Sequence, residues 1–478
     1  MTAPGPLRVA VIDVACALSD LDCTRDAPPP YAGAWILACR AGLPLGSVQI
    51  PLRGTRVAAN DLERELHKRF GGVWARERQD DAPALASASV VVCTNFARPV
   101  LLHRCLESLA ALDYPDYEVI VVDNRPAGSP AEDLARTMVV REPRPGASAA
   151  RNRGLAVARG EIVAFTDDDV EVDPGWLRAL GERLGRQPDV AAVTGLAVPR
   201  ELETPAQIWF EESRRLSDRS FLPLAFFLGG RFWVVHRSIE DGSERLVSLY
   251  AMGERGGSWN IAFRATALRG MGGFDEALGI GTPACGGEDL ALIVELLTSG
   301  HCVGYEPSAV VYHTHRATLA ELQRQMHGYG VGFTAMLTAI TLRNPWHLVG
   351  MAMVVPAWVR SLVNPASAQH AARTPTYPRA LVRTELRGML AGPFAYMRSR
   401  RMQRRWPDER AEPIDHVVRH QRRAQPARDQ RQAPLVRRGA VGLPLVLSVA
   451  AAAIEGVQLL SWCLRRATRA RWERRARN

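Results

Sequence analysis

The sequence is short of lysine, of paired cysteines and of long apolar runs, and each shortage excludes a class of protein. Lys68 is the only lysine, so the chain lacks the glycine- and lysine-containing phosphate loop expected of a nucleotidyltransferase. The eight cysteines form no Cys-x-x-Cys pair and follow no regular spacing. This pattern argues against a zinc site or disulfide framework and favours thiols in a reducing compartment. The first apolar stretch, Val9 to Leu18, is short and contains Asp13, so we expect no signal peptide.

Charge is distributed unevenly along the 478 residues. From residue 365 onward, 24 arginines and eight acidic residues leave a charge of +16, whereas the whole chain carries +10. The first 364 residues therefore carry −6, and the basic character belongs to the tail. The apolar fraction of 47% and the charged fraction of 23% are typical of a globular protein. A chain of this length can hold two or three domains.

Changes in composition along the chain predict four regions. Residues 1–82 contain short β-type runs separated by glycine and proline, with a helix at 61–70, and indicate a small α+β accessory module. Residues 83–318 form the main domain, and residues 319–364 a helical extension. Residues 365–478 are an arginine- and proline-rich tail, which we expect to be only partly ordered apart from an apolar helix at 442–464.

Strand and helix patterns alternate from residue 89 onward. The predicted strands are 89–94, 117–123, 138–140, 162–166 and 309–312, and the predicted helices are 100–112, 131–136, 147–158 and 290–297. This alternation predicts an α/β fold with a doubly wound, mostly parallel sheet and right-handed crossovers.

Three consecutive carboxylates, Asp167-Asp168-Asp169, follow the apolar strand 162–166. The carboxyl ends of strands in such a sheet are where ligands bind. Two carboxylates about 5 Å apart repel by roughly 3 kcal/mol at an effective dielectric near 20. A hard cation such as Mg²⁺ or Mn²⁺, shared with a phosphate, usually offsets that cost. The alternative is a solvated acidic turn before the helix that begins near Pro174.

Two more polar positions follow predicted strands. Thr94 and Asp123 end the first two strands, and the carboxylate of Asp123 can accept a hydrogen bond from the imide N–H of uracil or thymine. Asp123 could equally cap a turn. Arg151 begins a helix after a glycine-containing loop, a position that favours anions, although an exposed arginine with a purely structural role fits equally well.

Taken in order, these motifs resemble those of the inverting glycosyltransferases of family 2, which have the GT-A fold. The resemblance covers residues 89 to about 318 and rests on Cys93-Thr94-Asn95, 121–124, 146–154, the acid triplet, 258–264, 272–275 and 286–290. Each motif alone is weak, but their order and spacing are specific.

The resemblance implies a role for each site residue. The residues that would contact the donor nucleotide are Thr94, Asn95, Asp123, Arg151, Asp167 and Asp168. A Mg²⁺ or Mn²⁺ ion would be held by Asp167 and Asp169, completed by His313 or His315. Asp289 would be the general base, and Glu288, Trp259 and Asn260 would bind the acceptor.

The residues themselves leave alternatives open for several of these roles. Glu288 and Asp289 also suit a helix N-terminus as capping acids. Two histidines at alternate strand positions face the same side, and such a pair is often only hydrogen-bonded. Asp168 could contact the nucleotide through its backbone or be solvated. The glycine-rich run 279–287 is expected to be a mobile loop that closes over the donor.

The resemblance implies a metal-dependent inverting glycosyltransferase that uses a UDP- or dTDP-linked sugar. The acceptor would be a hydroxyl of a glycan, a lipid-linked molecule or a small molecule, as in polysaccharide biosynthesis of the cell envelope. The competing hypothesis is a catalytically silent scaffold that binds nucleotide sugars or glycans. Retention of both Asp169 and Asp289 argues against it, since a silent site needs no base.

Residues 442–464 are apolar but contain Glu455, and their summed insertion free energy is near zero. This segment could span marginally, lie flat on a membrane or pack as a protein helix. The flanking arginines favour an anionic membrane surface at the cytoplasmic face. No nucleic-acid-binding motif accompanies the basic tail, so we expect no nucleic-acid partner.

Overall fold

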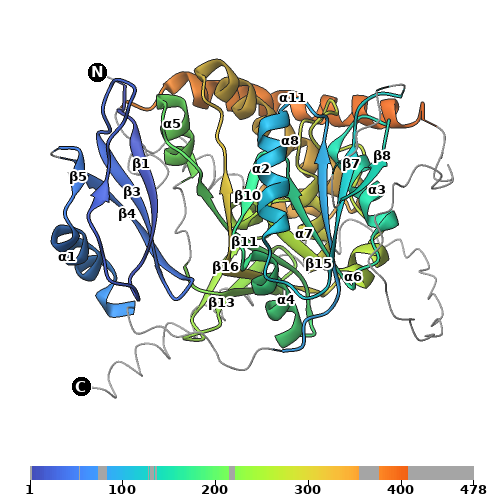
Figure 1. Cartoon of the computed structure of the whole chain (residues 1–478). Coiled ribbons are helices and arrows are strands. Elements are labelled where there is room, and N and C mark those ends of the chain that lie inside the picture. Colours follow the sequence, from blue (N-terminus) through green and yellow to red (C-terminus); the bar gives the residue numbers. More distant parts are fainter. Residues whose placement is uncertain are drawn as a thin grey trace. The chain divides into compact units, whose positions relative to one another are not determined.

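The structure is a computed structural model that describes residues 3–52, 54–73, 83–127, 129, 134, 137–214, 221–354 and 376–406 (Figure 1). The chain divides into two units, Met1–Val418 and Arg419–Asn478, and all described residues belong to the first. The predicted apolar helix at 442–464 and nearly all of the predicted helix at 131–136 lie outside the described residues.

The N-terminal residues, where the sequence predicts short β-type runs, form a small sheet of their own. Its strands, in spatial order, are β1 (Leu7–Asp13), β3 (Gly33–Arg40) and β4 (Leu43–Pro51). β1 pairs in parallel with β3, and β3 pairs antiparallel with β4. The remaining elements of this region are β2 (Leu21–Asp22), β5 (Arg56–Val57), α1 (Ala59–Phe70) and a 3₁₀ turn at Gly71–Val73.

Strand β3 is apolar along nearly its whole length because both of its faces are covered. Ile36 packs with Leu62 and Leu66 of α1. Trp35 and Leu37 point the other way and pack with apolar residues of the central domain, among them Leu196.

A larger sheet of 11 strands forms the central domain. Its strands are β6 (Ala88–Thr94), β7 (Tyr117–Asp123), β8 (Met138–Arg141), β9 (Ile162–Asp167), β10 (Val170–Val172), β11 (Val190–Pro199), β12 (Leu224–Gly230), β13 (Trp233–Ser238), β14 (Glu244–Ser248), β15 (Ile261–Arg264) and β16 (Cys302–His313). The spatial order is β14-β13-β12-β16-β11-β15-β9-β6-β7-β8, and β10 pairs with β16.

The α/β class predicted from the sequence is confirmed, and the sheet combines two pairing modes. β9, β6, β7 and β8 pair in parallel, as do β11 and β16. β15 lies antiparallel between β9 and β11, and β12 to β14 extend the far edge as antiparallel neighbours. Hydrophobic periodicity reports which face of a strand is buried but not the direction of its neighbour, so the antiparallel part was not predicted.

Helices cover both faces of this sheet (Figure 1). One face carries α2 (Pro99–Ala110) and α4 (Trp176–Arg186), and the other carries α3 (Ala147–Val157), α6 (Ala265–Gly270) and α7 (Glu288–Thr298). The central domain also contains α5 (Pro205–Arg214) and a 3₁₀ helix at Leu249–Arg255.

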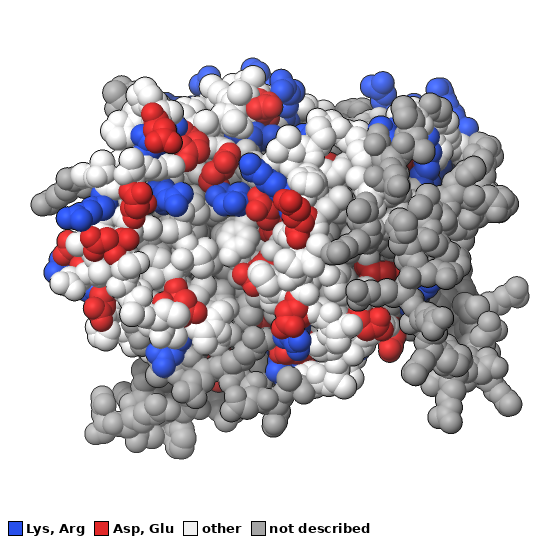
Figure 2. All heavy atoms as spheres, viewed as in Figure 1, with Lys and Arg blue, Asp and Glu red and all other residues white. Residues whose placement is uncertain are grey.

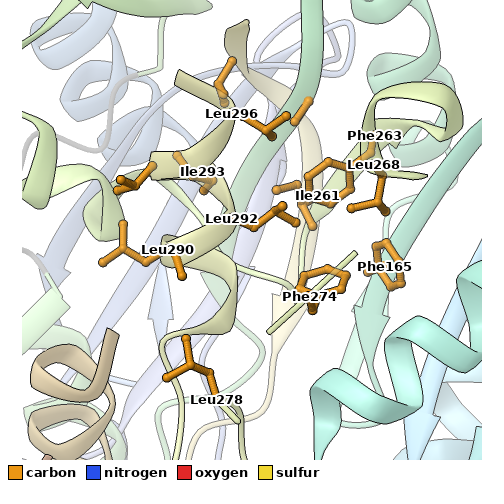
Figure 3. Close-up of a cluster of buried hydrophobic side chains, with 14 of the residues drawn as sticks. Phe165, Ile261, Phe263, Leu268, Phe274, Leu278, Leu290, Leu292, Ile293 and Leu296 are labelled. Carbon is orange, nitrogen blue, oxygen red and sulfur yellow. The ribbon is translucent and has the colours of Figure 1, made fainter. Parts of the chain in front are cut away.

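Helix α7 is largely buried, and its packing positions its first residues. Its buried side chains Leu292, Ile293 and Leu296 belong to the same core as Phe165 of β9 and Phe263 of β15 (Figure 3). Since each fully buried side chain of this kind contributes roughly 1.5–3 kcal/mol, the position of α7 against the sheet is strongly determined.

Two long helices complete the described part. α8 (Leu319–Arg343) begins with a capping box between Thr318 and Glu321, and α11 (Arg379–Gln403) packs along it. The two helices lie close together because glycines of α11 contact the backbone of α8. A Cβ at Gly388 would lie 2.2 Å from the carbonyl oxygen of His327. α11 occupies part of the tail that we expected to be only partly ordered.

Candidate active site

The polar residues predicted at strand ends meet at one edge of the sheet. β6 lies between β7 and β9, and the register places Thr94 opposite Asp123 and Cys93 opposite Asp167. The first acid of the triplet therefore ends its strand beside the ends of the first two strands. This is the crevice in which α/β sheets take their ligands.

Asp168 points inward and is only 4% exposed, so it is not the solvated residue that the sequence allowed. Its carboxylate accepts hydrogen bonds from Thr94 Oγ1 at 2.7 Å and from Arg98 Nη2 at 2.6 Å. Burial raises the pKa of Asp168, while Arg98 and Thr94 oppose that rise. Asp168 therefore holds the turn after β9 against the end of β6.

Asp169 is surrounded by positive or protonatable groups. Arg98 Nη1 and Arg316 Nη2 both pair with its Oδ2, the latter at 3.4 Å, and His313 Nε2 lies 3.6 Å from its Oδ1. Burial alone would raise the pKa of this carboxyl, but His313, Arg98 and Arg316 together hold it well below its usual range. Asp169 is thus held as an anion in the folded protein.

The histidine pair divides its roles between two partners. His313 faces Asp169, whereas the His315 Nε2 lies 3.3 Å from Glu211 and its ring packs at 4.6 Å between centroids against Phe210. The expected metal contact is therefore available to His313 and not to His315, whose Nε2 already has a carboxylate partner. The rings are 5.2 Å apart, so His315 helps to fix the position of His313.

The donor set at this edge fits a divalent cation that is shared with a substrate. Among the described residues, no group of three His, Cys, Asp or Glu side chains converges to form a complete metal cage. Asp169 and His313 nevertheless offer an oxygen and a nitrogen side by side. Mg²⁺ and Mn²⁺ at phosphate sites are held by one or two carboxylates and complete their coordination with water and phosphate oxygens. Two protein ligands are therefore sufficient.

Arg151 joins the acid triplet to the second acidic motif. It is buried at 3% exposure on α3, donates to Glu288 Oε1 at 2.6 Å, and donates to Asp167 Oδ1 at 3.1 Å. Its guanidinium also lies 5.8 Å from the centre of the Phe274 ring. A single side chain thus brings together residues that are distant in the sequence, and Arg151 is not the exposed structural arginine that the sequence allowed.

Glu288 and Asp289 begin α7 but face different surroundings. Glu288 is 4% exposed; burial and the neighbouring Asp289 raise its pKa, while Arg151 opposes that rise. Asp289 is half-buried and accepts hydrogen bonds from the backbone N–H groups of Ser258 and Leu290, at 3.1 and 2.7 Å. Of these two acids, only Asp289 is partly exposed, which suits a general base.

The formal charge of the site is negative, which favours binding of a divalent cation. Five carboxylates meet three arginines there: Asp167, Asp168, Asp169, Glu288 and Asp289 with Arg98, Arg151 and Arg316. Formally this set has two uncompensated negative charges.

The glycine-rich run before α7 is held by backbone contacts of its own. Gly279 and Gly286 form a bridge, and Ala147 at the start of α3 donates to the carbonyl oxygen of Ile280 at 2.8 Å. Gly287, at a φ of 87°, lies against Gly332 of α8, where a Cβ would come within 2.5 Å of a carbonyl oxygen. The run thus fixes the start of α7 relative to α3.

Asp123 lies where the sequence predicted, at the end of β7, but its carboxylate is fully engaged. Arg125 donates to both oxygens through its backbone N–H and its side chain, and Arg141 donates to Oδ2 at 2.8 Å. These four bonds use the roughly four lone-pair sites of a carboxylate. Contact with a nucleobase N–H therefore requires one arginine to move. The Arg125 guanidinium also lies 4.2 Å from the centre of the Phe96 ring. Asn95, which precedes Phe96 in the sequence, is exposed.

The predicted acceptor role of Asn260 is wrong. Asn260 is completely buried, accepts a hydrogen bond from Trp176 Nε1 at 2.8 Å, and donates to the carbonyl oxygens of Leu196 and Ala309. It joins α4, β11 and β16 in the core and has no surface to offer a substrate. Trp259 is partly buried against the same core.

The sequence interpretation missed the arginines that pair with the acids: Arg98, Arg125, Arg141 and Arg316. With 60 basic residues, nearly all arginine, residue type alone did not distinguish them. Position offered a signal for Arg98, because Pro99 marks the first turn of a helix and the preceding residue must lie in the loop after β6. Arg316 likewise follows the end of β16.

Sequence comparison finds known relatives for part of the chain. Residues 89–242 match the family model described as Glycosyl transferase family 2. Over these residues the chain is similar to the family 2 glycosyltransferases. The chain is 32% identical over 188 residues to the pre-mycofactocin glycosyltransferase of Mycobacterium tuberculosis, covering 39% of this chain and 33% of that protein.

One further relative and one solved structure carry the names of other sugar transferases. Glucosyl-dolichyl phosphate glucuronosyltransferase of Haloferax volcanii is 27% identical over 207 residues, covering 40% of this chain and 56% of that protein. The chain thus spans a third to about half of the length of these two relatives. Among solved structures, the mannosyltransferase PcManGT from Pyrobaculum calidifontis, in complex with GDP-Man and Mn²⁺, is 20% identical with a TM-score of 0.37, covering 72% of this chain and 94% of that one.

Proposed function

We propose that the protein is a metal-dependent inverting glycosyltransferase. It moves a sugar from a UDP- or dTDP-linked donor to a hydroxyl of a glycan, lipid-linked or small-molecule acceptor. The observation that carries this proposal is the bridge from Asp167 through Arg151 to Glu288. The bridge brings the strand-end acids and the start of α7 into one site.

In the proposed reaction, the Asp289 carboxylate takes the proton of the acceptor hydroxyl. The acceptor oxygen then forms a bond to the anomeric carbon from the face opposite the diphosphate. The bond between that carbon and the diphosphate oxygen breaks, and the nucleoside diphosphate leaves with the bonding electrons. Attack from the opposite face inverts the configuration, and a positioned base of this kind contributes about 10²- to 10⁴-fold to the rate.

Other residues would orient the two substrates. Asp169 and His313 would hold the divalent cation, together with Asp167, and the bound cation would supply Lewis-acid stabilisation of the departing diphosphate. Glu288 cannot serve as the base while it is buried and paired with Arg151, so we assign it to positioning. Asp123, Arg125 and Phe96 would form the nucleobase end of the donor site.

The acceptor class is supported only by the names of relatives. The Haloferax volcanii relative is named for transfer to a glucosyl-dolichyl phosphate, a lipid-linked acceptor. We propose the same class here, at the cytoplasmic face of a membrane, in assembly of a cell-envelope glycan.

The test is turnover of a panel of UDP-, dTDP- and GDP-sugars by the full chain, with Mn²⁺, with Mg²⁺ and with a chelator. We expect cation-dependent release of a nucleoside diphosphate from one donor, and NMR of the product should show an inverted anomeric centre. A retained configuration would refute the inverting mechanism. Cation-dependent binding of nucleotide sugars without any turnover, with or without acceptors, would favour the silent scaffold instead.

A further inference from the structure

Helix α11 has one face that packs on the protein and one that does not. Its inner face, which includes Leu381, Gly388, Gly392 and Tyr396, is buried. Thr334 of α8 donates to the carbonyl oxygen of Met389 at 2.7 Å, so the rotation of α11 about its own axis is set by these contacts.

The outer face of α11 carries a stripe of large apolar side chains. Leu386, Leu390, Phe394 and Met397 are spaced by four, four and three residues, which places them on one side of the helix. Leu390 and Phe394 are 79% and 80% exposed, more than any other large apolar side chain of the described residues. Single exposed apolar residues are common, but a continuous stripe indicates a binding surface.

Arginines frame this stripe on its flanks and at both ends. The helix contains six arginines, all exposed, and one acid, Glu385: the arginines are Arg379, Arg383, Arg387, Arg398, Arg400 and Arg401. Figure 1 draws α11 along one edge of the molecule beside α8, and Figure 2 shows basic side chains along the same edge. An apolar stripe bordered by arginine is the composition of helices that lie in a membrane interface.

The charges distinguish a lipid surface from a second copy of the chain. Two copies meeting through this stripe would bring two sets of six arginines together, and like charges at an interface are destabilising. An anionic bilayer instead attracts the arginines, while the stripe enters the boundary between headgroups and acyl chains. Within the described ranges, no helix has the length and apolarity to cross a bilayer. The geometry therefore suits a helix that lies on the surface.

We propose that the outer face of α11 binds an anionic membrane surface, with Leu390 and Phe394 as its apolar anchors. Its residues are not those of the apolar segment predicted at 442–464. It also reaches the catalytic domain, because Tyr396 donates to Asp275 at 2.9 Å and Gln403 donates to the carbonyl oxygen of Glu276 at 2.7 Å. Glu276 in turn accepts from Asn152 of α3, the helix that carries Arg151. The inference rests on the proposed function only where it places the acceptor in the same lipid surface.

The test is co-sedimentation of the full chain with phosphatidylcholine vesicles, with and without phosphatidylglycerol, in the absence of donor and acceptor. We expect binding to the anionic vesicles, weakened about tenfold or more by the double variant Leu390→Ser/Phe394→Ser. The triple variant Arg383→Gln/Arg387→Gln/Arg398→Gln should bind anionic vesicles less and lose most of its salt dependence.

Matched controls come from α2, where Val100 is 65% exposed and Arg104 is exposed. Val100→Ser and Arg104→Gln should bind vesicles as the unaltered chain does. If the Leu390→Ser/Phe394→Ser chain bound anionic vesicles as tightly as the unaltered chain does, the proposal would be overturned. A change in its oligomeric state with unchanged vesicle binding would also overturn it, and would point to a second copy as the partner. Because vesicle binding needs no turnover, an inactive protein that still binds through α11 would refute the proposed function and leave this inference intact.

Discussion

Arg151 on α3 donates a hydrogen bond of 2.6 Å to Glu288 at the start of α7, 137 residues further along the chain, and both side chains are buried. The same guanidinium reaches Asp167 at the end of β9. A buried arginine between two carboxylates is costly to place unless both partners are present. The pair therefore couples the stability of the domain to the assembly of its site.

Replacing Arg151 with alanine should destabilise the protein by about 3–5 kcal/mol, because Glu288 would remain buried without its partner. Denaturant unfolding measures this loss. Adding Glu288→Gln to the Arg151→Ala chain should restore part of the stability, since the uncompensated charge is removed. Arg104→Ala, an exposed position on α2, serves as the control. If Arg151→Ala and Arg104→Ala lowered the free energy of unfolding equally, the ion pairs of Arg151 would have no special role in stability.

Replacing Asp289 with asparagine should abolish transfer and leave nucleotide binding nearly intact. The amide can still accept the Ser258 N–H, but it cannot take a proton from the acceptor, so kcat should fall by about 10²- to 10⁴-fold. Steady-state kinetics and calorimetric titration of the nucleotide separate the two effects. Turnover at the original rate would remove Asp289 from the mechanism.

Replacing Asp169 with asparagine should remove the dependence of nucleotide binding on the cation. The carboxylate that faces His313 would be lost, and Asp167 would be the one carboxylate left in the proposed ligand set. Titration of UDP and dTDP with and without Mn²⁺ tests this, and the two affinities should become equal in the variant. Asp113→Asn, at an exposed carboxylate, is the matched control. A variant whose nucleotide affinity still rises with Mn²⁺ would place the cation elsewhere.

The dependence of stability on pH should report on Asp123. Burial raises the pKa of this carboxyl, but hydrogen bonds from Arg125 and Arg141 outweigh that effect and lower it below its ordinary value of 3.8. The carboxylate therefore stabilises the folded protein fully above that value, and the contribution disappears as the pH falls through the lowered folded-state pKa. Asp123→Asn should thus lose stability at neutral pH, and the difference from the unaltered protein should shrink in acid. Unfolding free energies between neutral pH and pH 2 measure it; a difference that grows as the pH falls would contradict this account.

Much of the fold could be predicted because local patterns report local structure. The apolar runs placed β6, β7 and β9 to within a residue, and Thr94, Asp123 and Asp167 could be assigned to one edge because parallel strands end together. The acceptor role predicted for Asn260 was wrong because a local pattern does not report contacts with distant elements. It follows an aromatic residue within a recognisable motif, yet its hydrogen-bond partners come from β11, β16 and α4.

The sequence by itself determined the class of the domain, the position of each acid along the chain and the resemblance that joined them, because hydrophobic period and motif order are properties of the chain alone. Only the tertiary structure decided that His313 and not His315 faces Asp169, that Arg98 and Arg316 surround the triplet, and which side of α11 remains uncovered. The reason is physical: a side chain's partner is set by which elements pack against it, and packing over distances of 70 to 150 residues leaves no periodic trace in the sequence.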